Sequence, residues 1–438
     1  MIQRKILLVI FCASFFALST SAIHAQNLLF IHAGTVLVSA DQAPLSEQTI
    51  VVRNNKIERV QAGFVLPSKS DLATGVEVID LKEQFVLPGL MDMHVHLLGE
   101  LSPTSRTDAL FITTSMEALE GAHYANKTLM AGFTTVRDLG GNPEAIFALR
   151  DSVAKGLVPG PRIFAAGSAL AATGGHADVD GYKPELLKLW TPETICDGPY
   201  ECRRAVRYAI KMGADWIKIT ATGGVLSDTA TGTDQQMTDD ELIEIVSTAH
   251  GLGVKVAAHA HGADGVKAAL RAGVDSIDHG TFADSQAMTL FKQSGAYMVP
   301  TLSPGVKLPA KMEGNPFFTD AIKAKALAAS AAAQATFQEA YESGVKIAFG
   351  TDSAVTPHGE NADEFVMMVD AGMTPADAIR SATITAAELL GLEDKLGTLD
   401  PGKLADLVAV TGNPLQDIST LKVIDFVMKD GKVMKDSH

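Results

Sequence analysis

Two histidines lie two positions apart at the end of a mostly apolar segment. They are His94 and His96, in GLMDMHVHLLGE at residues 89–100. Side chains at this spacing on a β-strand point to the same face. Imidazole is a common ligand of zinc and similar divalent ions, so the pair suggests part of a metal site. A metal needs further ligands, which we expect at the ends of other strands.

Four more polar residues follow or interrupt apolar segments further along the chain. They are Lys218 in WIKIT, His259 in VAAHAHG, His279 in SIDHGTF and Asp352 in AFGTDS. Buried polar groups cost free energy unless they are paired, so packing alone does not explain such a set. The six residues together predict a metal centre.

Lys218 is the least expected member of this set, because a bare ammonium is costly inside a strand. In one interpretation its side chain turns outward and pairs in a helix layer. In the other, CO₂ has carboxylated the amine, and the resulting carbamate anion can bridge two metals. The residues themselves leave both interpretations open.

The elements that position these residues alternate between strands and helices. Eight apolar segments alternate with helix-like stretches such as DDELIEIVSTAHGLG and TPADAIRSATITAAELLG, which carry apolar residues at helical spacing. The alternation predicts an α/β fold, a (β/α)8 TIM-like barrel over residues 88–390 with its active site at the C-terminal strand ends. A doubly wound sheet gives a similar order but brings fewer strand ends to one place. The segments are the one carrying His94, then 134–140, 162–167, 216–222, 255–262, 276–282, 296–301 and 346–352.

The two ends of the chain have a different character. Residues 26–87 and 391–438 alternate apolar and polar residues between turn sequences such as NNK, DPGK and KDGK. We predict one small β-sandwich domain built from both termini.

Residues 1–25 read as a signal peptide. Arg4 and Lys5 precede an apolar stretch from 6 to about 18, and small residues end at Ala25. The stretch is short for a membrane span, and no later segment has the length and apolarity of one. We therefore expect an exported protein, periplasmic or secreted, with no membrane span in the mature chain.

Export changes the interpretation of the two remaining cysteines. Cys196 and Cys202 form an even pair with five residues between them, which favours a disulfide over two free thiols in an oxidising compartment. The formal net charge of −15 offers no basic face to phosphates and argues against nucleic acid as a partner.

The motifs together resemble the amidohydrolase superfamily. They are LPGLMDMHVHL, GFTTVRDLGG, WIKITATGG, VAAHAHG, SIDHGTF, AFGTDS and LGTLDPGKLADLVAV, and they span nearly the whole mature chain. Within the superfamily the chain is similar to the branch of imidazolonepropionase-like proteins, Xaa-Pro dipeptidases and ochratoxin-degrading amidohydrolases. Imidazolonepropionases proper use one metal and lack the bridging lysine, so Lys218 favours the dipeptidase side.

The resemblance implies a centre of two divalent metal ions, with zinc as the expected ion. His94, His96 and Asp352 would hold one ion, and His259 and His279 the other. Lys218, carboxylated, and a hydroxide would bridge them. Asp352 would also take a proton from the hydroxide and pass it to the leaving nitrogen.

Four further residues have two interpretations each. The family pattern gives the ligand role to His259 rather than His261, so we expect His261 beside the substrate or behind the ligands. His176 is either a surface loop residue or, as the resemblance implies, a group over the metals that hydrogen-bonds the scissile carbonyl. His358 either lies on the surface or lines the substrate site. Arg137 either binds a carboxylate or, as we favour, pairs with a neighbouring acid.

The implied activity is hydrolysis of amide or peptide bonds in small carboxylate-bearing substrates. N-acyl amino acids, Xaa-Pro dipeptides and ochratoxin-like amides all fit. A lactonase or phosphotriesterase on the same metal centre is the alternative, and a non-catalytic binding protein of the same fold is a weaker one. Whether the chain forms a homo-oligomer is left open.

Overall fold

A computed structural model of the chain describes residues 28–72, 76–108, 110–228 and 232–437. The predicted signal peptide, residues 1–25, lies outside this part. Over the described residues, no helix is both long and apolar enough to cross a membrane.

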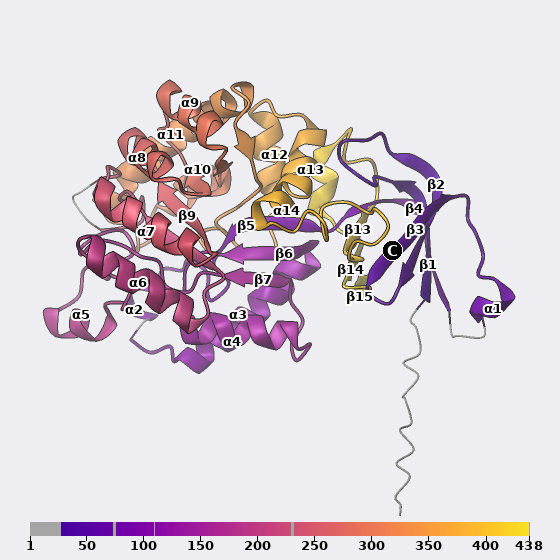
Figure 1. Cartoon of the computed structure of the whole chain (residues 1–438), viewed down its shortest axis with the longest axis horizontal. Helices are drawn as coiled ribbons and strands as arrows, with labels where there is room; N and C mark the ends of the chain where they lie inside the picture. Colours follow the sequence, from indigo (N-terminus) through magenta and orange to yellow (C-terminus); the bar gives the residue numbers. More distant parts are fainter. Residues whose placement is uncertain (1–27, 73–75, 109, 229–231, 438) are drawn as a thin grey trace, which may run out of the picture.

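The central layer consists of parallel strands in two hydrogen-bonded groups (Figure 1). One group has the order β5-β6-β7 and the other β12-β11-β10-β9-β8. Their residues are almost all buried, which fits strands covered on both faces. Each of the eight segments predicted from the sequence overlaps one of them, so the predicted strands are confirmed. The strands are β5 Leu90–Val95, β6 Phe133–Asp138, β7 Arg162–Ala165, β8 Trp216–Thr220, β9 Lys255–Ala260, β10 Ser276–His279, β11 Tyr297–Val299 and β12 Lys346–Ile347.

Backbone hydrogen bonds join the two groups at both edges. At one edge the amide of Leu170 donates to the carbonyl of Lys218 at 2.8 Å. At the other edge the amide of Met93 donates to the carbonyl of Phe349 at 2.8 Å. The amide of Asp352 donates to the carbonyl of His94, also at 2.8 Å. The fold is therefore mixed α/β, of the TIM-barrel type.

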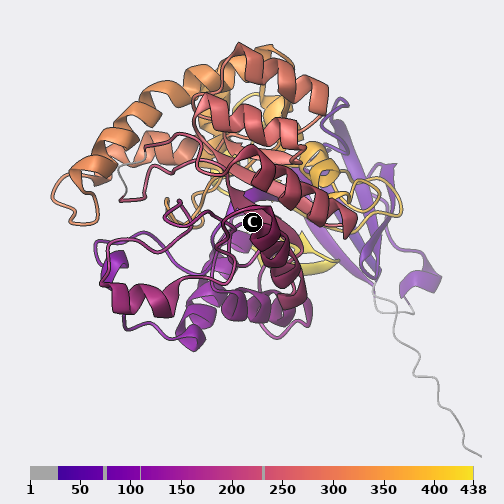
Figure 2. The same cartoon turned by 60° about the vertical axis from the view of Figure 1, so that its left-hand side comes forward.

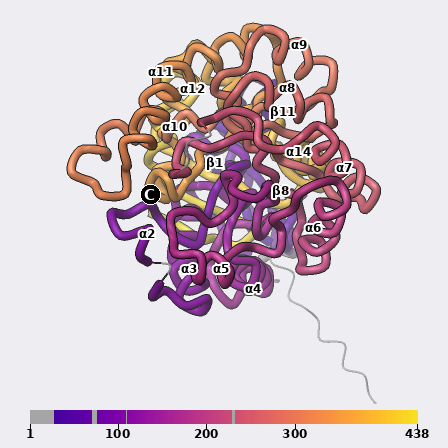
Figure 3. Tube along the Cα trace, turned by 90° about the vertical axis from the view of Figure 1, so that its left-hand side faces the viewer, coloured from indigo at the N-terminus to yellow at the C-terminus, as the bar shows by residue number. Residues whose placement is uncertain are grey.

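Helices surround these strands, and Figure 3 shows α3, α4, α6, α7 and α9 following one another around the rim. Local sequence explains their limits. Thr238 and Glu241 form a capping box at the start of α7, and Gly213 and Gly273 end α6 and α8 in the left-handed conformation. The helices are α1 Lys69–Leu72, α2 Ser105–Asp108, α3 Thr114–Met130, α4 Pro143–Ala154, α5 Pro184–Trp190, α6 Pro199–Met212, α7 Asp239–Gly251, α8 Ala263–Ala272, α9 Ser285–Ser294, α10 Leu302–Lys307, α11 Asp320–Glu342, α12 Asp363–Asp370, α13 Pro375–Ser381 and α14 Ile384–Leu390.

The two ends of the chain share one sheet on one side of the barrel (Figures 1 and 2). Its order is β15-β14-β13-β4-β1-β2-β3, and the amide of Ile57 in β3 donates to the carbonyl of Lys403 at 2.9 Å. Strands from both ends of the chain thus lie in the same sheet. The seven strands form a single hydrogen-bonded sheet, so the two-sheet sandwich stays a prediction, as do the domain limits. The strands are β1 Leu28–Val36, β2 Leu45–Arg53, β3 Lys56–Ala62, β4 Glu77–Pro88, β13 Leu407–Val410, β14 Phe426–Lys429 and β15 Lys432–Asp436.

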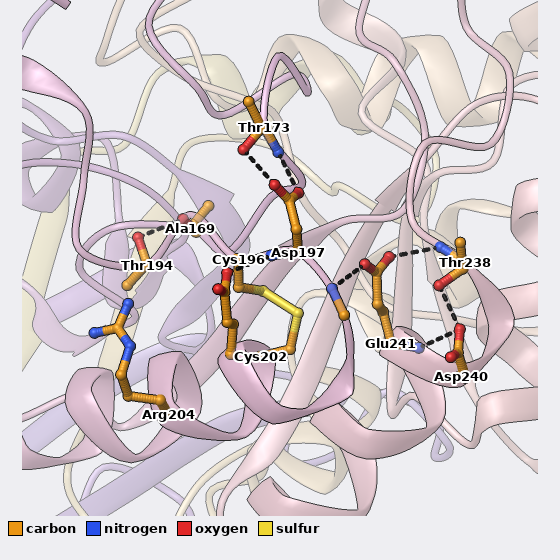
Figure 4. Close-up of a disulfide and its surroundings, with 12 residues drawn as sticks. Ala169, Thr173, Thr194, Cys196, Asp197, Cys202, Arg204, Thr238, Asp240 and Glu241 are labelled. Atoms are coloured by element: carbon orange, nitrogen blue, oxygen red, sulfur yellow. Dashed lines mark hydrogen bonds between the residues drawn. A yellow bond between two sulfur atoms is a disulfide. The ribbon is translucent and has the colours of Figure 1, made fainter. Parts of the chain in front are cut away.

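Cys196 and Cys202 form a disulfide, as predicted, and both side chains are buried (Figure 4). The bond ties the start of α6 to the segment before it. Asp197, next to the disulfide, accepts hydrogen bonds from the amide of Thr173 at 3.0 Å and from its hydroxyl at 2.7 Å. Through Thr173, the disulfide segment supports the loop that carries His176.

Candidate metal centre and active site

Five candidate ligands meet at the C-terminal ends of the barrel strands. His94 lies in β5 and His96 just beyond it, His259 lies in β9, His279 ends β10, and Asp352 follows β12. The parallel direction of the strands brings these ends to one side of the barrel. Two groups have donor atoms that all lie within 4.8 Å of one another: His94, His279 and Asp352, and His259, His261 and His279.

His94 and His96 face a single carboxylate oxygen, that of Asp352. The Nε2 atoms of His94 and His96 are 3.2 Å apart. Oδ1 of Asp352 lies 3.5 Å from Nε2 of His94 and 3.3 Å from Nε2 of His96. On the other side of the His96 ring, Nδ1 lies 2.9 Å from the carbonyl oxygen of Gly140, and this contact holds the ring. Such a second hydrogen bond orients a ligating imidazole.

The second group is oriented in the same way. Nδ1 of His279 is 2.6 Å from the hydroxyl of Thr301, and Nδ1 of His261 is 2.8 Å from the hydroxyl of Thr281. The ring centroid of His259 is 4.6 Å from that of His279 and 4.7 Å from that of His261. The threonines leave Nε2 of His261 and His279 free to take part in the cluster.

Buried imidazole nitrogens without a hydrogen-bond partner indicate whether these residues suit a metal. Nε2 of His259 is buried and has no hydrogen-bond partner among the described residues, whereas Nδ1 of His94 lies 3.8 Å from Oδ1 of Asp278. Unpartnered buried polar atoms are rare and call for an explanation such as an ion. Burial, the largest cause, lowers the pKa of His94 to about 4 and that of His259 well below its usual value. Neutral imidazole is the form that binds metal, so the donor set fits a divalent ion.

The backbone is strained where this cluster forms. His279 has φ 72°, Thr301 has φ 47° and Asp352 has φ 57°, in the left-handed region that residues with a Cβ seldom adopt. Such conformations cost of order 1–3 kcal/mol each and concentrate at functional sites. Here they occur at two candidate ligands and at the threonine that orients one of them.

Lys218 points into the barrel and forms an ion pair with Asp278. The interpretation in which its side chain turns outward into a helix layer is therefore wrong. Burial lowers the pKa of Lys218 from its usual value, and the nearby charge of Asp278 opposes this effect. Carboxylation of the amine stays a prediction.

Arg137 is a structural residue, as expected. Its Nη2 lies 3.1 Å from Oδ1 of Asp278, its Nη1 donates to the hydroxyl of Ser276, and its Nε donates to the carbonyl of Met93. The guanidinium also stacks on the ring of Trp216, 4.6 Å from the centroid. Arg137 thus joins three strands below the cluster.

Sequence reasoning missed Asp278. Its carboxylate contacts both Lys218 and Arg137, and Oδ1 lies 3.8 Å from Nδ1 of His94. Alternation along a strand would turn residues 278 and 279 to opposite faces. The left-handed conformation of His279 breaks the alternation and brings both side chains inward. The acid inside SIDHG was the available signal.

His176 lies against the cluster, as the resemblance implied. Its ring centroid is 4.3 Å from that of His259, and its Nδ1 contacts the hydroxyl of Ser227. Its backbone amide donates to the side-chain carbonyl of Gln236 at 2.9 Å. Burial lowers the pKa of His176 to about 4, so the ring is neutral at ordinary pH.

The expectation for His358 needs correction. The residue is neither on the surface nor in the cavity: it is 1% exposed. Its Nε2 lies 3.0 Å from the carbonyl of Gly99, and its ring stacks on Tyr124 with centroids 4.7 Å apart. The loop that carries His358 folds back under the chain after β5, so this histidine supports the wall of the site from behind.

A cavity of about 470 Å³ opens above the cluster. His96, His176, His261, His279 and Asp352 form its polar base. A second space of about 840 Å³ shares His96 and His176 with it and extends to Lys218. The remaining wall of the first cavity is largely apolar and includes Leu98, Leu101, Val225, Leu226, Leu308 and Ala329.

Residues 85–434 match the model of the amidohydrolase family. An ochratoxinase from Aspergillus niger is 33% identical over 432 residues, covering 93% of this chain and 87% of that protein. A solved Xaa-Pro dipeptidase with methionine bound in its active site is 43% identical, with a TM-score of 0.87 over 93% of this chain and 99% of that one. A solved prolidase in complex with N-methylphosphonate-L-proline is 31% identical, with a TM-score of 0.84 over 94% and 100%.

The chain therefore belongs to the amidohydrolase family and is a hydrolase. Its relatives include both an ochratoxinase and an Xaa-Pro dipeptidase, so the branch indicated by the sequence motifs is confirmed.

Proposed function

We propose that this protein is an exported, metal-dependent hydrolase of amide or peptide bonds in small carboxylate-bearing substrates. The observation that carries the proposal is the cluster at the cavity base. There, histidines from three strands and Asp352 converge, and the buried Nε2 of His259 lacks a hydrogen-bond partner among the described residues. The disulfide between Cys196 and Cys202 supports export.

In this proposal the cluster would hold two divalent ions, with zinc as the expected ion. His94, His96 and Asp352 would hold one ion, and His259 and His279 would hold the other. Lys218, if carboxylated, would contribute an anionic oxygen ligand. When bound, such ions make hydroxide available from water at neutral pH and polarise the substrate carbonyl.

The protein residues divide the remaining tasks. Asp352 accepts the proton of the attacking water and delivers it to the leaving nitrogen; its carboxylate lies at the cavity base. His176 donates a hydrogen bond to the carbonyl oxygen as negative charge develops there. Ser227 contacts its Nδ1, which leaves Nε2 for the substrate. His261 lines the cavity and contacts the substrate.

The substrate class rests on the relatives and on the cavity. An ochratoxinase and an Xaa-Pro dipeptidase are among the relatives, and the resemblance carried by the motifs implies small amides with a carboxylate on the amine side. The two spaces that meet at His96 and His176 suit the two halves of such an amide. The apolar wall of the first space suits an acyl group with an apolar side chain.

A substrate panel tests the proposal. Purified mature protein loaded with zinc is given N-acyl amino acids, Xaa-Pro dipeptides, an ochratoxin-like amide, lactones and phosphotriesters. We expect the highest kcat/KM for one of the carboxylate-bearing amides. A lactone or phosphotriester turned over much faster than every amide would replace the proposed substrate class, and no turnover by metal-loaded protein would favour a binding protein.

A further inference from the structure

We infer that Gly224 and Lys325 are positioning residues that hold His176 in place, the first by leaving room for its ring and the second by fixing the loop beneath it. The inference rests on the role proposed for His176. Neither Gly224 nor Lys325 is a candidate metal ligand.

The His176 ring packs directly on the backbone of Gly224, which we call the seat of the ring. A Cβ atom built on Gly224 would lie 2.1 Å from Cε1 of His176, 2.2 Å from Nδ1 and 2.4 Å from Nε2. Real Cβ atoms do not approach other heavy atoms so closely. The φ of Gly224 is not in the left-handed region, so an alanine there would meet no backbone strain of that kind. The ring of His176 is thus what an alanine would collide with.

The ring cannot yield towards the barrel. On that side the centroid of His259 lies 4.3 Å from the centroid of His176. An added methyl group must therefore displace the His176 ring from the position in which the hydroxyl of Ser227 contacts Nδ1. The ring would leave the position from which Nε2 reaches a carbonyl.

Lys325 fixes the segment that provides this seat. From α11, its Nζ donates to the carbonyl of Gly224 at 2.8 Å and to that of Ser227 at 2.6 Å. These are the residue under the ring and the residue that contacts Nδ1. A single ammonium therefore sets the distance between the two supports of His176.

The same segment also touches the substrate space. Val225 and Leu226, between the two carbonyls, line the first cavity together with Ala326 and Ala329 of α11. A substrate in that cavity would contact the segment that Lys325 holds through its two hydrogen bonds. Positioning of this kind matters because displacement of a catalytic group by about 1 Å can cost on the order of 10² in rate.

Crystal structures of zinc-loaded Gly224→Ala and Lys325→Met give the direct test. We expect the His176 ring to move away from Ser227 and from its 4.3 Å distance to His259 in both variants, with the zinc content of wild type. Gly251→Ala and Lys323→Met are the matched controls. A Cβ at Gly251 meets nothing within 4 Å, and Lys323 lies on the same helix as Lys325. A His176 ring that stays in place in both test variants would overturn the inference, whatever the activity.

Kinetics supply a second readout that a merely structural effect would not reproduce. Gly224→Ala should lower kcat by roughly 10²-fold, close to the cost of losing one oxyanion donor, with little change in KM. In a His176→Ala background the same substitution should cost nothing further, and Lys325→Arg should restore most of the activity lost in Lys325→Met. An equal loss from Gly224→Ala in both backgrounds would contradict the inference. A His176→Ala protein with wild-type kcat would instead contradict the proposed role of His176, while the crystal structures would still decide the positioning.

Discussion

The side chains of Lys218 and Asp278 form an ion pair inside the barrel, where they are 4% and 0% exposed. Asp278 also pairs with Arg137, which is fully buried. Removing one partner of a buried ion pair leaves an uncompensated charge and typically costs about 3–5 kcal/mol. While Lys218 is not carboxylated, the acid therefore pairs with two cations next to the candidate metal centre.

In metal-free protein whose Lys218 is not carboxylated, Asp278→Ala should lower the free energy of unfolding by about this amount, because Lys218 and Arg137 would both lose their carboxylate partner. Denaturant unfolding of the wild type and the variant measures it. Asp264→Asn is the control, since Asp264 is 88% exposed in its pair with Lys267 and such pairs contribute little. Equal stability of Asp278→Ala and wild type would show that the pair does not stabilise the barrel.

Asp352→Asn tests the proposed proton transfer. The amide keeps the shape and one oxygen of the carboxylate but cannot accept a proton. Loss of general acid–base help typically lowers the rate by about 10² to 10⁴, so we expect a kcat loss of this order with much of the metal retained. Metal content and kcat are measured on the same preparation. Near wild-type kcat with both metals bound would rule out Asp352 as the proton carrier.

Glu364 should make stability depend on pH. Its buried carboxylate accepts hydrogen bonds from the amides of Leu302 and Ser303, and burial raises its pKa to about 7. The pKa of Glu364 is higher in the folded than in the unfolded state. Glu364 therefore contributes fully to the free energy of unfolding below about pH 4.5, and this contribution is lost as pH rises towards 7. Wild type should therefore lose stability relative to Glu364→Gln between pH 5 and pH 8. The Tm difference across this range measures it, with Glu360→Gln, at an exposed neighbouring acid, as the control.

The disulfide should stabilise the protein modestly. It closes a short loop, for which the chain-entropy relation gives about 2 kcal/mol. Cys196→Ser with Cys202→Ser should lower the free energy of unfolding by this order. Because Asp197 holds Thr173 near His176, we also expect a lower kcat. Recovery of both thiols in alkylated form from wild-type protein kept away from reductant would contradict the disulfide itself.

The strand order was predictable because each barrel strand is a short apolar segment flanked by turn or helix signals, as in KVAAHAHG and KIAFGTD. Strand ends in a barrel converge, so the histidines and Asp352 could be grouped without knowing any distance. The long helical pattern at 374–391 was read correctly as helical, although the structure divides it into α13 and α14.

The missed features depend on backbone conformation and on contacts between distant segments. Asp278 and His279 both face inward because His279 has a positive φ, which no pattern of apolar residues reveals. His358 is buried because its loop folds under Gly99, far away in the sequence. The seat of His176 likewise joins the loop after β8 to α11.

The central claim is that this hydrolase uses metal held by the histidine cluster to cleave amides. The most direct measurement is metal content beside kcat on a carboxylate-bearing amide, for wild type and for His279→Ala. We expect about two divalent ions per chain in active wild type, loss of activity on chelation with recovery on adding zinc, and joint loss of metal and activity in the variant. Full activity of wild-type protein holding well below one ion per chain would contradict it.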